Sequence, residues 1–197
     1  MNPYLTEDER AILGATRVGI AGAGGLGSNC AMHLVRAGLR HLVICDFDVV
    51  NESNLNRQFF FRDQIGQKKV VALEANLRRI APDLDLEMRD VTLDATNVAT
   101  IFAACEIVVE AFDSADAKAM LFGTLLPRGV RVVGASGIAG WGRSGTLAPR
   151  RLGRNLVMVG DGTSGVAPEC APNSPRVGIA AAMEANTVVA LLLNKEI

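Results

Sequence analysis

The order of three segments near the N-terminus constrains the fold most. Residues 18–21 ("VGIA") are an apolar run that ends at Gly22, as a short buried strand does. A glycine-rich turn follows, and residues 25–38 ("GLGSNCAMHLVRAG") have the pattern of a helix closed by Gly38. A strand that passes through a tight turn directly into a helix begins a β-α unit, which predicts a parallel sheet.

The same alternation continues along the chain. Further strands are predicted at 41–46, 84–90, 107–112 and 130–136, and helices at 65–82, 94–105 and 114–129. Because several of these strands are continuously apolar, we expect an α/β fold with a Rossmann-like, mostly parallel sheet and helices on both faces. After Ser136 the alternation loosens, and residues 146–152 and 155–161 are candidates for two late, antiparallel strands. Residues 176–194 form a helix that is apolar nearly all round, so it must be buried, in part against a second subunit.

Bulk properties exclude several classes of protein. A length of 197 residues fits one domain, which we expect to span residues 1–197. The net charge of −1 argues against a nucleic-acid partner. No apolar stretch reaches the ~18 residues of a membrane span, and the N-terminus does not read as a signal peptide, so we expect a cytoplasmic protein. The four cysteines are scattered without a Cys-x-x-Cys pair, so no zinc is expected. We expect both histidines, His33 and His41, to be structural.

The glycine turn predicts a phosphate-binding site. "GAGGLG" fits the pattern G-x-G-x-x-G through Gly22, Gly24 and Gly27. Glycines in this place let a phosphate approach the backbone at the start of a helix, where N–H groups and the helix dipole favour anions. Asp46 ends the second strand about 20 residues on, where a carboxylate accepts hydrogen bonds from ribose hydroxyls. The turn alone leaves NAD, FAD, ATP and S-adenosylmethionine open.

A second group of polar residues discriminates among these ligands. Asn54, Arg57, Gln58 and Lys69 lie between the second strand and the next helix. A redox dinucleotide reacts at its nicotinamide, far from its two phosphates, and has little use for several polar groups there. A triphosphate that is cleaved at one phosphorus needs them, because charge develops there in the transition state. We therefore interpret this segment as binding a triphosphate, with Arg57 as a bidentate donor.

Asp113 follows the predicted strand at 107–112, at a carboxyl end of the sheet. A carboxylate that faces a triphosphate would most simply hold Mg²⁺. The other interpretation is that Asp113 caps the helix that begins near Ser114. The two roles do not exclude each other.

Five motifs in this order, "GAGGLG", "DFD", "NLNRQ", "GQKKV" and "FDSADAK", resemble the ThiF/MoeB/HesA family, whose adenylation fold is shared with the ubiquitin-activating enzymes. The resemblance is strong from Arg17 to Ser136 and weak beyond. Within the family, the short chain is most similar to the compact ThiF-type enzymes that adenylate the sulfur carrier ThiS in thiamine thiazole synthesis.

The resemblance implies an adenylyltransferase that uses ATP and Mg²⁺. The glycine turn with Gly25 would line the phosphates, Asp46 would bind ribose, and Asn54, Arg57 and Gln58 would contact the triphosphate. Arg57, Lys69 and Asp113 would carry the catalysis, with Asp113 positioning Mg²⁺. The substrate would be the C-terminal glycine carboxylate of a ubiquitin-like carrier that ends in Gly-Gly, and the enzyme would be a homodimer.

The chain departs from the family in three places. It lacks the paired Cys-x-x-Cys motifs of many relatives. Its N-terminus does not match the helix from which relatives send an Arg into the partner's site, and Arg10 is only a weak substitute. Cys170, in the loop "PECAP", is a loose match to a cysteine that some relatives join covalently to the carrier. Alternatives therefore stay open: a MoaD-type carrier, threonylcarbamoyl-tRNA as in the cyclising dehydratases, an NAD-dependent oxidoreductase, or a nucleotide-binding module without catalysis.

Overall fold

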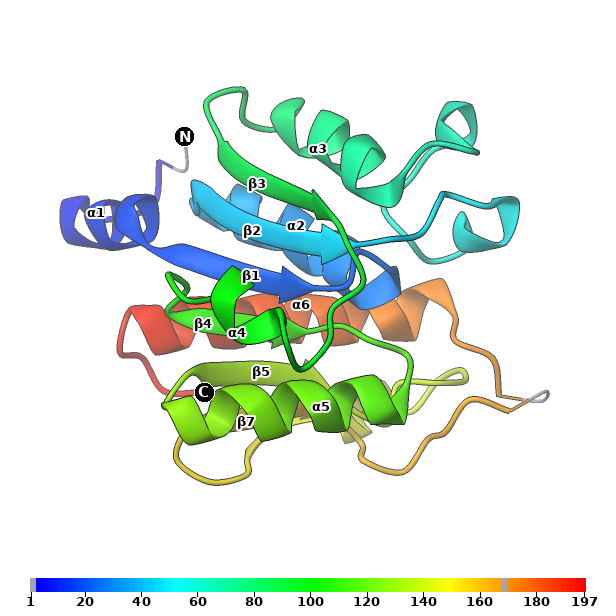
Figure 1. The fold of residues 1–197 in the computed structure, drawn as a ribbon. Helices are drawn as coiled ribbons and strands as arrows, with labels where there is room; N and C mark the ends of the chain where they lie inside the picture. Colours follow the sequence, from blue (N-terminus) through cyan, green and yellow to red (C-terminus); the bar gives the residue numbers. More distant parts are fainter. Residues whose placement is uncertain (1–2, 168–169) are drawn as a thin grey trace.

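A mostly parallel sheet forms the centre of the molecule (Figure 1). The computed structural model describes residues 3–167 and 170–197, and in these ranges the sheet has seven strands in the order β3-β2-β1-β4-β5-β7-β6. The strands are β1 (Arg17–Ala21), β2 (His41–Asp46), β3 (Asp85–Asp90), β4 (Ile107–Glu110), β5 (Arg131–Ala135), β6 (Ala148–Arg151) and β7 (Leu156–Gly160). The predicted α/β fold is confirmed.

Strand β1 lies between β2 and β4 and is parallel to both. Ala21 stands in register with Cys45 on one side and Glu110 on the other, so these three strands end side by side. The order of strands reverses between β1 and β4, and ligands of open α/β sheets bind outside the carboxyl ends at such a point. Of the two late strands, only β6 is antiparallel: it pairs with β7, which itself continues the parallel sheet beside β5.

The α-helices are α1 (Glu7–Ala15), α2 (Gly25–Ala37), α3 (Lys69–Arg78), α4 (Val98–Ile101), α5 (Ala115–Leu125) and α6 (Ser174–Leu192). Short 3₁₀ helices are η1 (Glu52–Asn54), η2 (Arg62–Gln64), η3 (Leu126–Arg128) and η4 (Ser144–Thr146). Helix α1 was not predicted, although Thr6 and Glu9 form a capping box that a T-x-x-E pattern signals. The helix predicted at 94–105 shrinks to four residues, because the Asp94 side chain accepts backbone N–H groups in the preceding turn and competes with helix formation.

Two apolar clusters cover the two faces of the sheet. Helices α2, α3 and α6 pack on one face, and α4 and α5 on the other, as Figure 1 shows with α5 in front of the sheet and α6 behind it. The last helix is largely buried, as predicted, but its buried set includes the carboxylic acid Glu184. None of the described helices is long and apolar enough to cross a membrane.

Candidate functional site

The glycine turn joins β1 to α2 at the switch point. Gly22 has a positive φ of 103°, and a Cβ on Gly27 would lie 1.9 Å from the Gly22 carbonyl oxygen, so both positions require glycine. Asp46, at the end of β2, accepts a hydrogen bond from the Ala23 N–H at 2.6 Å. The predicted ribose-binding carboxylate is therefore in direct contact with the turn. No side chain caps α2 at Gly24, so the N–H groups at the helix start suit an anion.

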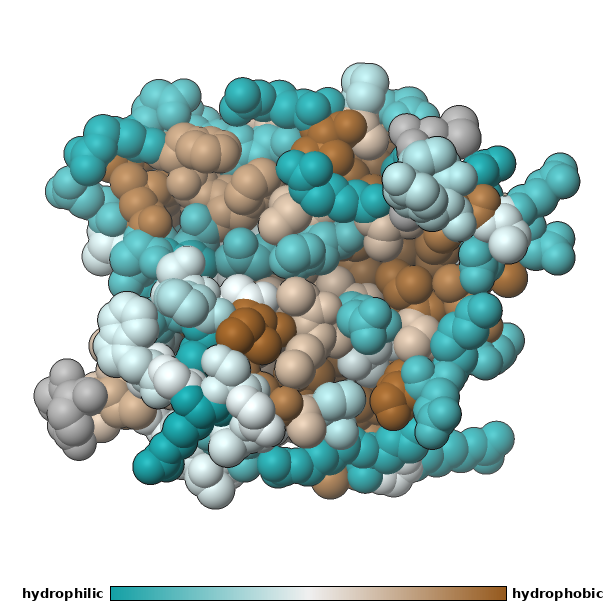
Figure 2. Space-filling model, turned by 180° about the vertical axis from the view of Figure 1, so that it is seen from behind, coloured by the Kyte–Doolittle hydropathy of each residue, from teal (hydrophilic) through white to brown (hydrophobic). Residues whose placement is uncertain are grey.

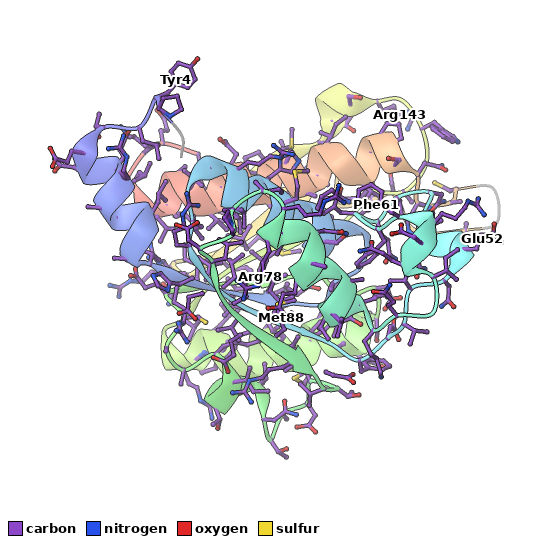
Figure 3. All side chains as sticks on the ribbon, turned by 90° about the horizontal axis from the view of Figure 1, so that it is seen from above. Tyr4, Glu52, Phe61, Arg78, Met88 and Arg143 are labelled. Atoms are coloured by element: carbon purple, nitrogen blue, oxygen red, sulfur yellow. The ribbon has the colours of Figure 1, made fainter. Side chains whose placement is uncertain are left out.

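Residues 48–69 leave the end of β2 and return to it. The excursion is closed at its base by the backbone bonds from Val50 N–H to Gln67 O (2.8 Å) and from Lys69 N–H to Asp48 O (2.9 Å). Figure 3 shows two members of the excursion, Glu52 and Phe61, at the end of the molecule where α6 begins. This closure returns the chain to the carboxyl edge and places Lys69 at the first position of α3, as predicted.

Within the excursion, Arg57 and Gln58 both reach the glycine turn. The stem of Arg57 packs over Gly25, where an added Cβ would lie 3.4 Å from Arg57 Cγ. Gln58 is 9% exposed, and its Nε2 would lie 3.9 Å from a Cβ on Gly24. Its Oε1 is buried and lacks a partner among the described residues. A buried acceptor without a partner is costly, and a nucleotide could donate to it from a ribose hydroxyl or the base amino group, but not from its phosphates.

Asn54 organises the turn that holds this pair. Its carbonyl oxygen accepts the N–H groups of Arg57 and Gln58, and its side chain accepts the N–H of Asn51. The Arg57 guanidinium donates to Ser53 O at 3.2 Å and therefore stays at the surface of the excursion. The structure thus brings together the glycine turn, Asp46 and the predicted group of residues 54–58.

Lys69 is 5% exposed, and its ammonium group donates to the Asp48 carboxylate at 2.7 Å. Sequence reasoning did not single out Asp48, although "DFD" places it two residues after Asp46. The ion pair neutralises a cation that is otherwise too costly to bury. A phosphate that binds Lys69 therefore has to share the ammonium group with Asp48 or displace the Asp48 carboxylate.

Asp113 lies after β4 and is exposed. The suggestion that it caps α5 is wrong: the cap is Ser114, whose hydroxyl accepts the N–H of Ala117. The described residues contain no group of three or more acidic, histidine or cysteine side chains that could hold a metal ion by themselves. Mg²⁺ usually binds through one or two carboxylates together with substrate phosphates, so a single exposed carboxylate at this edge fits that mode.

Just below Asp113 lies an ion pair that sequence reasoning missed. Glu110 is fully buried, and Lys118 donates to both of its carboxylate oxygens at 2.8 Å and to Ala135 O. Glu110 also accepts the N–H of Phe112, which fixes the turn that leads to Asp113. Burial raises the pKa of Glu110 above its ordinary value, while Lys118 acts in the opposite direction. Glu110 and Lys118 are eight residues apart and lie on a strand and a helix, so neither a helical nor a strand period in the sequence indicates that they pair.

The late loops meet at the start of α6. Arg176 is buried and donates to the carbonyls of Gly142 and Arg143 and to the Asp161 carboxylate. Cys170 is half-buried, and its sulfur would lie 3.0 Å from a Cβ on Gly140. Pro168 and Glu169, which belong to the "PECAP" loop, lie outside the described residues. The other three cysteines are free and buried, as predicted: Cys30, Cys45 and Cys105.

The chain is similar in sequence to known proteins. The chain is 30% identical to the SAMP-activating enzyme E1 of Haloferax volcanii over 80% of this chain and 58% of that protein. It is 35% identical to the molybdopterin-synthase adenylyltransferase of Escherichia coli over 54% of this chain and 43% of that protein. The chain thus covers less than two thirds of either curated relative.

A solved structure of E. coli tRNA N6-threonylcarbamoyladenosine dehydratase in complex with AMP has the same fold. The TM-score is 0.89 at 19% identity, and the match covers 95% of this chain and 90% of that one. The ThiF family profile matches residues 1–197. With the glycine turn, Asp46 and the 54–58 segment placed together, we conclude that the chain belongs to the ThiF family.

Proposed function

We propose that this protein adenylates the C-terminal glycine carboxylate of a ubiquitin-like sulfur carrier, of the ThiS type, at the expense of ATP. On this proposal residues 1–197 form one adenylation domain. The observation that carries it is the convergence of Arg57 and Gln58 on the glycine turn, where the buried Gln58 Oε1 has no partner among the described residues. A dinucleotide needs the turn but has no use for an arginine whose stem packs against it. The names of the two curated relatives, an activating enzyme and an adenylyltransferase, support the same activity.

In the proposed reaction, a carboxylate oxygen of the carrier attacks the α-phosphorus of ATP. The bond from that phosphorus to the bridging oxygen breaks, and pyrophosphate leaves with its electron pair. The start of α2 stabilises phosphate charge, Arg57 stabilises the charge that develops on the leaving group, and Lys69 holds phosphate oxygens. Because the attacking carboxylate is already ionised, the step needs positioning and charge stabilisation but no general base. Asp113 would hold Mg²⁺, which would supply further positive charge to the phosphates.

The test is ATP–pyrophosphate exchange with purified protein. Exchange that requires a small carrier ending in Gly-Gly is the expected result, and parallel assays with ThiS-type and MoaD-type carriers distinguish the two. Exchange without any carrier contradicts a carrier substrate. Absence of exchange under all conditions, together with tight NAD binding, rejects adenylation.

The second candidate substrate is threonylcarbamoyl-tRNA. It is favoured by the match to the tRNA-modifying dehydratase, which covers nearly the whole of both chains. The net charge of −1 speaks against it, since tRNA binding relies on a basic surface. Adenylation that depends on modified tRNA and is insensitive to carriers identifies this alternative.

We propose further that the protein is a homodimer that pairs through the exposed side of α2 and α6. Figure 2 shows this rear face, where apolar residues lie among polar ones. A groove of about 210 Å³ runs between the two helices and is lined mainly by small and apolar side chains, including Ala37, Ala182 and Val189. Sedimentation should give a dimer for the wild type and a monomer for Ala182→Arg. A monomeric wild type at micromolar concentration removes this part of the proposal.

A further inference from the structure

Two consecutive side chains in the first turns of α2 bind the backbone of the 54–58 segment and its neighbour. Ser28 Oγ accepts the N–H of Phe59 at 3.0 Å, and Asn29 Nδ2 donates to Arg57 O at 2.8 Å. Both residues also bind their own helix four positions back: Ser28 Oγ donates to Gly24 O at 2.6 Å, and Asn29 Nδ2 donates to Gly25 O at 2.7 Å. The glycine turn and the arginine segment are therefore joined through side chains that neither motif includes.

We propose that Asn29 is a positioning residue, which sets the place of Arg57 relative to the phosphate-binding turn. The inference rests on the proposed function for its catalytic meaning, whereas the hydrogen bonds themselves belong to the nucleotide-free protein. Asn29 does not need to touch the substrate. It acts through the Arg57 backbone.

The chemistry of the amide explains why asparagine suits this position. A primary amide carries two N–H donors on one nitrogen, and Asn29 directs them at two carbonyl oxygens, one on each motif. Among the described residues, Asn29 is the only side chain that hydrogen-bonds to the Arg57 carbonyl. Removing this donor leaves the carbonyl without a partner in the described part of the chain, and the segment then has one anchor fewer to α2.

A shift of this segment moves a charged group at the site of chemistry. The Arg57 stem packs against Gly25, with Val177 of α6 close to the same spot, and its guanidinium binds Ser53 O and the Asn56 side chain in the nucleotide-free protein. The backbone that Asn29 holds therefore sets the position from which the guanidinium can reach the phosphates. A displacement of ~1 Å at a catalytic group costs on the order of 100-fold in rate. The charge on the leaving group arises only during the reaction, so the effect is expected in kcat more than in the KM for ATP.

The decisive variant is Asn29→Ser. A serine at this position can still donate to the carbonyl four residues back, as Ser28 does, but it is too short to reach Arg57 as well. Asn29→Ser therefore removes the inter-segment bond selectively. In ATP–pyrophosphate exchange with the carrier, we expect kcat to fall about 10- to 100-fold, with KM for ATP changed less than about threefold.

A second variant, Asn29→Asp, has the same shape but replaces both donors with acceptors. Near pH 8 its carboxylate repels both carbonyls, and at lower pH the protonated acid regains one donor. The ratio of its kcat to that of the wild type should therefore rise as the pH falls from 8 to 5.

Hydrogen exchange of the 54–59 segment in the absence of nucleotide gives a readout apart from activity. It should be faster in Asn29→Ser than in the wild type. Asn97→Ser is the matched control, because Asn97 is also half-buried and donates its amide to one backbone carbonyl, that of Thr92, in another turn. This control should leave the kcat of ATP–pyrophosphate exchange and the protection of residues 54–59 from hydrogen exchange near their wild-type values.

The outcomes separate the two ideas. Wild-type kcat and protection in Asn29→Ser overturn the role of Asn29. A loss of kcat that Asn97→Ser reproduces assigns the effect to general stability and overturns the role of Asn29 equally. If the wild type itself shows no adenylation, the proposed function fails. Faster hydrogen exchange of residues 54–59 in Asn29→Ser would still support the anchoring of the segment by Asn29.

Discussion

The buried carboxyl group of Glu184 should make the free energy of unfolding depend on pH. It is fully buried on α6, and neither carboxylate oxygen has a hydrogen-bond partner among the described residues. Burial raises the pKa of Glu184 well above its ordinary value of 4.5; the neighbouring Glu110 acts in the same direction, and Lys118 opposes it. The native protein therefore keeps the acid protonated in a pH range where the unfolded chain has released the proton.

This difference sets the sign of the pH dependence. The contribution of Glu184 is most favourable below pH 4.5 and is lost as the pH rises through the raised native pKa. In that window the free energy of unfolding falls by up to about 1.4 kcal/mol per pH unit. Glu184→Gln cannot titrate, so its stability relative to the wild type should increase with pH. Glu184→Leu also removes the unpaired polar group, so its free energy of unfolding should exceed that of Glu184→Gln by about 1–3 kcal/mol.

Urea unfolding at several values between pH 5 and pH 8 measures these differences. Titrating groups that do not interact with Glu184 are common to wild type and variant, so they cancel in the comparison. Glu110 and the Cys30 thiol interact with Glu184, so the measured difference includes the change in those interactions. A stability difference between Glu184→Gln and wild type that does not change with pH would refute the reasoning. It would mean that the native carboxyl titrates as it does in water.

Four further results are expected. Arg57→Ala should lower pyrophosphate exchange by two or more orders of magnitude without a change in the circular dichroism spectrum, and wild-type turnover would remove Arg57 from the mechanism. Cys170→Ser should leave the exchange intact, because the adenylate forms without a thiol; a collapse would show a role for this thiol before transfer. Gly27→Ala should prevent nucleotide binding or folding, since its Cβ would lie 1.9 Å from Gly22 O, and tight ATP binding by calorimetry would contradict this. Lys118→Met should destabilise the fold by about 3–5 kcal/mol in urea unfolding, because it leaves its buried carboxylate partner unpaired; a loss below 1 kcal/mol would show that the pair is not needed.

The sequence predicted those elements whose signal is local. Each central strand is a run of apolar residues buried on both faces, and α2 has glycine at both ends, so their bounds were predicted within a few residues. The helix predicted at 94–105 was too long, because the turn formed by Asp94 competes with helix formation and the apolar period does not reveal that competition. Helix α6 was predicted from its apolar composition, but the burial of Glu184 depends on tertiary packing.

The candidate site divides in the same way. Gly22 to Gly27 and Asp46 were predicted because glycine and carboxylate at fixed places in a β-α unit have few other uses. The partners of Lys69 and Arg57 were not predicted, since Asp48 and Asn29 lie 21 and 28 residues away along the chain. Their contacts exist only because the 48–69 excursion closes on itself.

The two outer strands of the sheet bear on how the protein behaves at high concentration. An open strand edge is a template for aggregation, because its free N–H and C=O groups can pair with another chain. Strand β3 carries the charges of Glu87 and Arg89, and β6 carries Arg150 and Arg151 beside Pro149, which has no N–H to donate. Strand addition at either edge would have to desolvate these charges. The protein should therefore resist aggregation through its strand edges at high concentration, and any assembly that it forms should use its helical faces.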